Sequence, residues 1–138
     1  MIKNQATPYL AFNGNAKEAL DFYKEVFSGE VTRIQTYGEA DYPTPPGADH
    51  FIIHSEFRKD ALSFMAADTF PGSTIQSGNQ ISLMIEFESE EEIVSVYKAL
   101  QNGGTKIMEL QDTFWGAKYG KVKDKFGITW DLNYTKES

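Results

Sequence analysis

The sequence predicts an α+β fold in which a β-α-β-β-β module occurs twice in tandem. Two segments with apolar side chains at helical spacing each follow a capping motif, and short β-branched or aromatic runs flank both in the same order. The pairs Tyr23-Lys24 and Tyr97-Lys98 lie 74 positions apart, about half the chain. At 138 residues the chain fits one domain, so we expect a single domain over residues 1–138 with modules at about 5–67 and 80–134.

The first module begins with a strand and a helix. Residues 5–12 are aromatic and apolar, which predicts a strand. Asn15 is followed three positions later by Glu18, the spacing of a capping box, and predicts the start of a helix. Ser28-Gly29 predicts its end. The apolar stripe between these signals predicts that one face of the helix packs on a sheet.

Three further strands complete the first module, at residues 31–37, 50–58 and 61–67. The last two flank a two-residue turn at Lys59-Asp60, which makes them an antiparallel hairpin. Residues 38–49 and 68–79 are rich in Pro, Gly and polar residues and predict long loops. The loop at residues 38–49 could be a lid over a binding site or a simple surface loop.

The second module repeats this order. Residues 80–87 predict a strand, Ser89 with Glu92 forms a second capping box, and Asn102-Gly103 predicts the end of the second helix. Three more strands are predicted at residues 106–111, 118–123 and 129–134.

Composition excludes several classes of function. Lys and Arg number 13 against 20 Asp and Glu, so the net charge of −7 argues against binding nucleic acid or an anionic membrane. The absence of cysteine excludes disulfides, thiolate zinc sites and a cysteine nucleophile. No apolar run approaches the ~18 residues of a spanning helix and no signal peptide is predicted, so we expect a cytoplasmic protein.

Two segments carry a resemblance to a known family. The sequences PYLAFNGNAKEALDFYKEVFSGEV and WGAKYGKVKDKFGITWDL resemble the PhnB-like branch of the vicinal oxygen chelate superfamily, and the match extends over about residues 7–134. The superfamily includes glyoxalase I, bleomycin resistance proteins and extradiol dioxygenases such as dihydroxybiphenyl dioxygenase. The resemblance implies a glyoxalase-like curved mixed sheet with a cleft, a small-molecule ligand and a homodimer. Members are often described as 3-demethylubiquinone-9 3-methyltransferase-like, but the glycine-rich turn of common methyltransferases is missing here.

The resemblance also implies where a divalent metal would bind. Catalytic members hold it with His, Gln or Glu on four strands, and the matching positions here fall at or next to Pro8, near Met65, at Gln80 and at Asp131. Only Gln80 and Asp131 suit a hard cation, so we expect no complete metal site and no cofactor. A strand register shifted by one would instead turn other side chains inward: Thr7, Gln5 or Ser63.

Histidines and aromatic residues supply the other candidates. His50 and His54 lie four apart on one predicted strand; they could flank the cleft, with His54 the better acid–base group, or lie on an exposed strand face or dimer contact. Trp115 and Tyr119 could line a pocket or pack in the core. Trp130 neighbours Asp131, so if Asp131 faces the cleft, Trp130 packs beneath the helices.

The sequence thus favours a small-molecule-binding protein whose ligand contacts are Met65, Gln80, Trp115, Tyr119 and Asp131. The alternative is a metal-dependent lyase, isomerase or dioxygenase that uses Gln80 and Asp131 together with His54. A third interpretation is a purely structural dimer module, which requires a cleft filled by the protein's own side chains.

Overall fold

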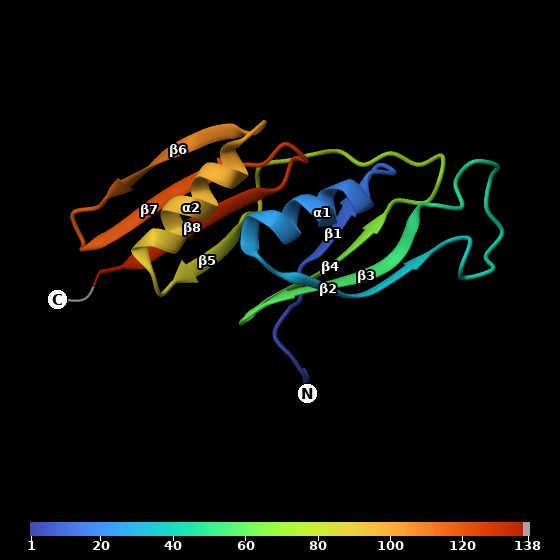
Figure 1. Cartoon of the computed structure of the whole chain (residues 1–138), viewed down its shortest axis with the longest axis horizontal. Helices are drawn as coiled ribbons and strands as arrows, with labels where there is room; N and C mark the ends of the chain where they lie inside the picture. The colour runs from blue at the N-terminus through green and yellow to red at the C-terminus, as the bar shows by residue number, and fades with distance from the viewer. Residues whose placement is uncertain (137–138) are drawn as a thin grey trace. The chain divides into compact units, whose positions relative to one another are not determined.

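The computed structural model describes residues 1–136, which form eight strands and two helices (Figure 1). They fall into two compact units, Met1–Gln76 and Ser77–Ser138. Each unit contains one four-stranded mixed sheet and one helix, in the order β-α-β-β-β. The predicted fold class is therefore confirmed. That the two modules form one domain stays a prediction.

The first unit arranges its strands in the order β1-β4-β3-β2. β1 runs parallel to β4, and the other neighbours are antiparallel. The elements are β1 (Tyr9–Phe12), α1 (Ala16–Phe27), β2 (Glu30–Thr36), β3 (Ile52–Lys59) and β4 (Leu62–Asp68).

The second unit repeats this topology with the order β5-β8-β7-β6, β5 being parallel to β8. Its elements are β5 (Leu83–Phe87), α2 (Glu90–Gln101), β6 (Thr105–Asp112), β7 (Ala117–Lys123) and β8 (Thr129–Thr135).

Within each unit the helix covers one face of the sheet, as Figure 1 shows. In the first unit Tyr23 of α1 packs edge-on against Phe64, with ring centroids 5.6 Å apart, and Phe64 stacks on Phe57 at 4.7 Å. In the second unit Trp130 and Leu132 of β8 are fully buried, as is Ile93 of α2. We call the opposite face of each sheet, which no helix of its own unit covers, the open face.

The two helices begin differently. Ser89 caps α2 as predicted, because its Oγ accepts from the Glu92 amide at 3.2 Å. The capping box predicted for α1 is wrong, since the Asn15 side chain makes no helix-capping bond. Asp68, at the end of β4, accepts from the Ala16 amide at 2.9 Å instead. A carboxylate brought in by the sheet therefore takes the place of the local cap.

Three predicted strands start two or more residues too early. β1 starts at Tyr9 because Pro8 has no amide hydrogen to donate. β3 starts at Ile52, which leaves His50 in the turn before it, so the two histidines do not share a strand. β5 starts at Leu83, and Gln80 lies in the exposed segment that precedes it. The turn between β3 and β4 is formed by Asp60, where φ is 52°, and Ala61, one position later than the predicted Lys59-Asp60.

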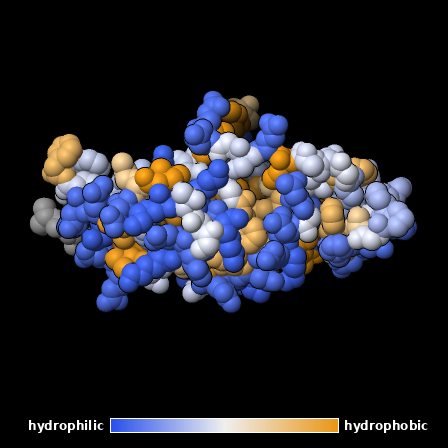
Figure 2. All heavy atoms as spheres, turned by 90° about the horizontal axis from the view of Figure 1, so that it is seen from above, coloured by the Kyte–Doolittle hydropathy of each residue, from blue (hydrophilic) through white to orange (hydrophobic). Residues whose placement is uncertain are grey.

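Figure 2 shows a face covered mostly by hydrophilic side chains, with hydrophobic ones scattered among them. Neither helix among residues 1–136 is long and apolar enough to cross a membrane.

Candidate functional site

A polar network centred on Asp131 lies on the open face of the second sheet. The Asp131 carboxylate is only 7% exposed. It accepts hydrogen bonds from the Ser82 hydroxyl, just before β5, and from the Tyr119 hydroxyl on β7. The Lys121 ammonium lies 3.7 Å from Oδ1 of the same carboxylate. Three donors from two other segments thus converge on one buried acid.

The last hairpin fixes which way Asp131 faces. Asp124 holds the turn through its Oδ1, which accepts from the amides of Phe126 and Ile128 at 2.8 and 3.1 Å. Its Oδ2 accepts from the Trp130 indole at 2.9 Å, on the side of the sheet where α2 packs. Because side chains alternate along a strand, Asp131 then faces the open side, as the sequence predicted.

Burial and the neighbouring carboxylate both act on Tyr119. Burial, followed by the hydrogen bond to Asp131, raises the pKa of Tyr119 to about 12. The phenol therefore stays neutral and keeps donating to Asp131 throughout the physiological range. Its oxygen retains lone pairs that can accept a bond from a ligand.

The family is settled by comparison with known proteins. The family model described as 3-demethylubiquinone-9 3-methyltransferase matches residues 4–133. The chain belongs to this family.

Three relatives match this chain over nearly their whole length. The chain is 30% identical to protein YjdN of Escherichia coli, and the match covers 95% of both chains. It is also 30% identical to protein PA1353 from Pseudomonas aeruginosa. The crystal structure of that protein matches with a TM-score of 0.85, over 98% of this chain and 100% of PA1353. A PhnB protein from Bacillus cereus is 31% identical, with a TM-score of 0.81 over 96% and 100%.

The fold extends to more distant proteins. The fosfomycin resistance protein FosX of Listeria monocytogenes, solved with Mn(II) and sulfate, is 13% identical with a TM-score of 0.64 over 99% of this chain and 95% of its own. The likeness to FosX shows a shared fold. The resemblance to the PhnB-like branch is confirmed by the family model and by the Bacillus cereus PhnB protein.

The strand registers of this PhnB-like protein correct one expected metal position, at Gln80, and agree with the other, since Tyr9 lies next to Pro8. On β5 the residue in register with Asp131 is Met84, so Gln80 lies outside the strand that was predicted to carry it. On β1 the residue in register with Met65 is Tyr9, while the Pro8 carbonyl accepts from the Met65 amide at 2.9 Å.

These residue types do not suit a resident hard cation. The register positions offer one carboxylate, one phenol and two thioethers, and thioethers favour soft metals. Both oxygens of Asp131 already accept hydrogen bonds from side chains. Among residues 1–136, no three His, Asp or Glu side chains are grouped as metal ligands.

The remaining predicted site residues lie apart from the Asp131 network. Met65 is half-buried on the open face of the first sheet, and His54 on β3 lies 3.2 Å from the Tyr9 hydroxyl. Trp115 lies in the turn between β6 and β7, 60% exposed, with its ring edge-on to Phe114 at 4.9 Å. Ligand contacts at Met65, Trp115 and Gln80 stay predictions.

Sequence reasoning missed two members of the network. Lys121 lies two positions after Tyr119 on the same strand, so strand alternation alone could have placed both on one face. Ser82 falls inside the strand predicted at residues 80–87 but lies just before β5, and nothing in the sequence marks it as a partner of Asp131.

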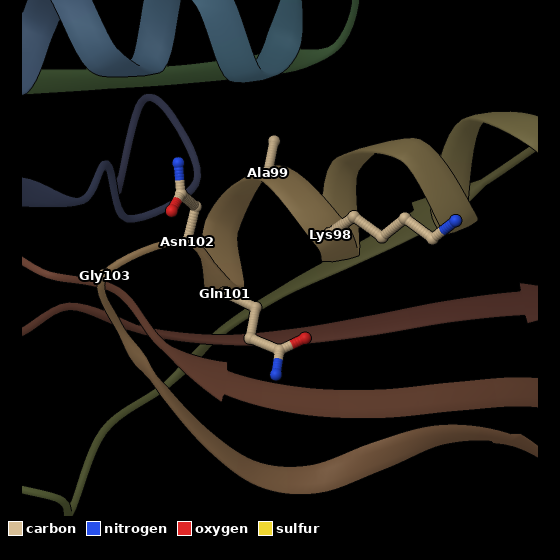
Figure 3. A pocket seen from close by; sticks show the side chains of 5 residues that line it. All are labelled: Lys98, Ala99, Gln101, Asn102 and Gly103. Atoms are coloured by element: carbon tan, nitrogen blue, oxygen red, sulfur yellow. The ribbon is translucent and has the colours of Figure 1, made fainter.

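A shallow hollow lies at the C-terminal end of α2 and shares no residue with the Asp131 network. Figure 3 shows its lining residues, and the side chains of Lys98 and Asn102 point away from each other there. The lining is formed by Lys98, Ala99, Gln101, Asn102 and Gly103. Since none of these residues belongs to the Asp131 network, the hollow plays no part in the candidate site.

Proposed function

We propose that this protein binds a small, largely apolar or aromatic molecule on the open face of the second sheet, next to Tyr119 and Asp131, without a resident catalytic metal. The observation that carries the proposal is the Asp131 carboxylate, buried to 7% exposure on a sheet face that no helix of its unit covers. Family membership supports the same conclusion, because the chain shares its fold with a PhnB protein and with PA1353 over nearly its whole length.

A contribution to folding stability does not by itself explain the polar network around Asp131. A buried ion pair is often no more stabilising than well-packed apolar residues of the same size, because both charges lose their hydration. Ionisable groups with shifted pKa values concentrate at functional sites instead, and the pKa of Tyr119 is raised to about 12. This comparison favours a role in ligand binding.

The chemistry of the face suggests the class of ligand. Tyr119 can accept a hydrogen bond and Lys121 can donate one, which fixes a polar group of the ligand. Met84, in register with Asp131 and 61% exposed, offers an adaptable apolar surface beside them. A flat molecule with one or two polar groups matches this combination.

Methyl transfer is not part of the proposal, despite the family description. Common methyltransferases hold their cosubstrate at a glycine-rich turn of a doubly wound parallel sheet. Both sheets here are four-stranded and mostly antiparallel, and each is covered by one helix. The topology therefore supports a binding role more than this transfer reaction.

Nuclear magnetic resonance with neutral aromatic fragments tests the proposal. Phenol, indole and benzamide serve as probes, and we expect amide shifts to change around Ser82, Met84 and Tyr119. Asp131→Asn and Tyr119→Phe should weaken binding about tenfold, a loss of about 1.4 kcal/mol. Glu109→Gln, at an exposed residue of β6, is the matched control and should leave binding unchanged. Fragments that leave this face unaffected, or bind both variants as tightly as the wild type, would overturn the proposal.

A further inference from the structure

A second chain of ionisable side chains lies on the open face of the first sheet. The Tyr9 hydroxyl on β1 lies 3.2 Å from Nδ1 of His54 on β3. Nε2 of His54 lies 3.5 Å from a carboxylate oxygen of Glu56, and the same oxygen lies 3.5 Å from Nε of Arg33 on β2. The contacts therefore link three strands of one sheet without using the Asp131 network.

The Tyr9–His54 contact passes over an intervening strand. β4 lies between β1 and β3, and its Met65 is in register with both Tyr9 and Glu56. These side chains remain accessible, because Tyr9 is 54% exposed and the side chain of His54 is 37% exposed. A solute can therefore reach the hydroxyl and the imidazole together.

The contacts of His54 determine which of its two ring nitrogens donates a hydrogen bond and which accepts one. A carboxylate only accepts, so Glu56 favours a hydrogen on Nε2. In neutral His54, Nδ1 is then an acceptor, and the Tyr9 hydroxyl donates its hydrogen bond to this nitrogen. In protonated His54, Nδ1 becomes a donor to the Tyr9 oxygen, and the Tyr9 hydrogen is free to point outward.

Protonation also changes the local charge. With neutral His54, Arg33 and Glu56 balance each other; with protonated His54 the group carries one net positive charge. On β4 the only acid is Asp68, whose oxygens hold the amides of Ala16 and Ile52. The other charged residues of β2 and β3 are Glu30, Arg58 and Lys59, and Tyr37 lies near Tyr9.

We propose that Tyr9, His54 and Arg33 form a proton-gated binding site for a small oxyanion, with a carboxylate as the best fit to the Arg33 guanidinium. The anion accepts the Tyr9 hydrogen that protonation of His54 releases and is attracted by the added positive charge. Glu56 sets the orientation of His54 and does not contact the anion. At higher pH the Tyr9 hydrogen turns back to Nδ1 and the anion is released.

Benzoate and sulfate are suitable probes because both keep their charge at about pH 5 and about pH 8, on either side of the range where histidine titrates. Binding to the full chain is followed by nuclear magnetic resonance of the His54 ring, with His50 as an internal control. We expect binding to be at least about tenfold tighter at the lower pH, and by linkage the anion should raise the proton affinity of His54 by the same factor.

Variants separate this site from general electrostatic attraction. Tyr9→Phe should remove most of the gain at low pH, whereas His50→Gln should retain it. Binding of benzoate alone indicates a carboxylate site, and binding of both probes indicates a general oxyanion site; either supports the proposal. Equal binding at both pH values, no binding, or full gating in Tyr9→Phe would overturn it. Neutral aromatic fragments should still bind Tyr9→Phe, so failure here is distinguishable from failure at Asp131.

Discussion

Two aspartates of the last hairpin have opposite roles. Asp124 is a structural residue, because its two oxygens hold the backbone of the turn and the indole of Trp130. Asp131 faces the other side of the same sheet and accepts hydrogen bonds from the half-buried side chains of Ser82 and Tyr119. The same chemical group therefore serves the fold at one position and the candidate site at the other.

Asp124→Ala should destabilise the protein strongly. The variant leaves the amides of Phe126 and Ile128 and the buried Trp130 indole without this acceptor. We expect the free energy of unfolding to fall by about 3 kcal/mol. Urea unfolding followed by tryptophan fluorescence measures the change, and Asp112→Ala at an exposed end of β6 is the control. A loss as small as that of the control would contradict the structural role.

The Tyr119 phenol gives a pH prediction. Because its pKa is raised from 10.0 to about 12, the folded protein prefers the neutral phenol. The resulting stabilisation is fully present below pH 10 and is lost as the pH rises toward 12. Burial also raises the pKa values of Tyr37 and Tyr97, so the Tyr119 signal is identified by difference. Ultraviolet difference titration should show a late phenolate that is missing in Tyr119→Phe and that titrates earlier in Asp131→Asn. A phenolate with the same pKa in wild type and Asp131→Asn would argue against the hydrogen bond.

Single residues were predictable where a neighbour fixed their direction. Trp130 must be buried, so the opposite orientation of Asp131 followed from strand alternation. Gln80 was misplaced because hydrophobic patterning locates a strand but not its first residue. Contacts such as Ser82 with Asp131 depend on pairing between β5 and β8, which the sequence does not reveal.

At the scale of elements, the first helix depends on the sheet for its start. Asp68 joins the amide of Ala16 in α1 to the amide of Ile52 in β3, at 2.9 and 2.8 Å. The predicted cap at Asn15 failed because a long-range carboxylate replaced a local interaction. Both helix ranges were nevertheless predicted closely, since apolar spacing and stop signals are local properties.

Asp68→Ala should therefore cost about 2 kcal/mol of unfolding free energy, because two buried amides lose their acceptor. Asn15→Ala is the matched control and should cost less than about 0.5 kcal/mol, because Asn15 bonds only the exposed Asn13 amide. Chemical unfolding of both variants checks the order. A larger loss for Asn15→Ala would show that the local cap matters more.

For the whole molecule, the residue types at the superfamily's metal positions predict weak metal binding. Protein purified without chelator and titrated with Mn²⁺, Ni²⁺ and Zn²⁺ should bind no tight equivalent. One tight equivalent per chain that disappears in Asp131→Ala would contradict this and favour the metal-dependent lyase, isomerase or dioxygenase.

A homodimer remains our prediction for the assembly. β2 and β6 are edge strands and carry exposed apolar side chains, among them Ile34 at 44% and Ile107 at 49% exposure. Such edges favour association with a second chain. Light scattering should give twice the mass of the 15.6 kDa chain. Of the variants Ile34→Lys and Ile107→Lys, the one that lowers the mass to that of a monomer identifies the edge strand that forms the interface. A monomeric mass for the wild type would contradict the prediction.

The pairing of first with last strands has a consequence for how the chain acquires its structure. β1 pairs with β4 and β5 with β8, so each module's opening strand has no strand partner until its closing strand exists. During synthesis the first module becomes complete once Asp68 has left the ribosome, before any of the second module is needed for its sheet. Because each sheet is built from one continuous half of the chain, the sequence separation of its strand contacts stays short, which favours rapid folding.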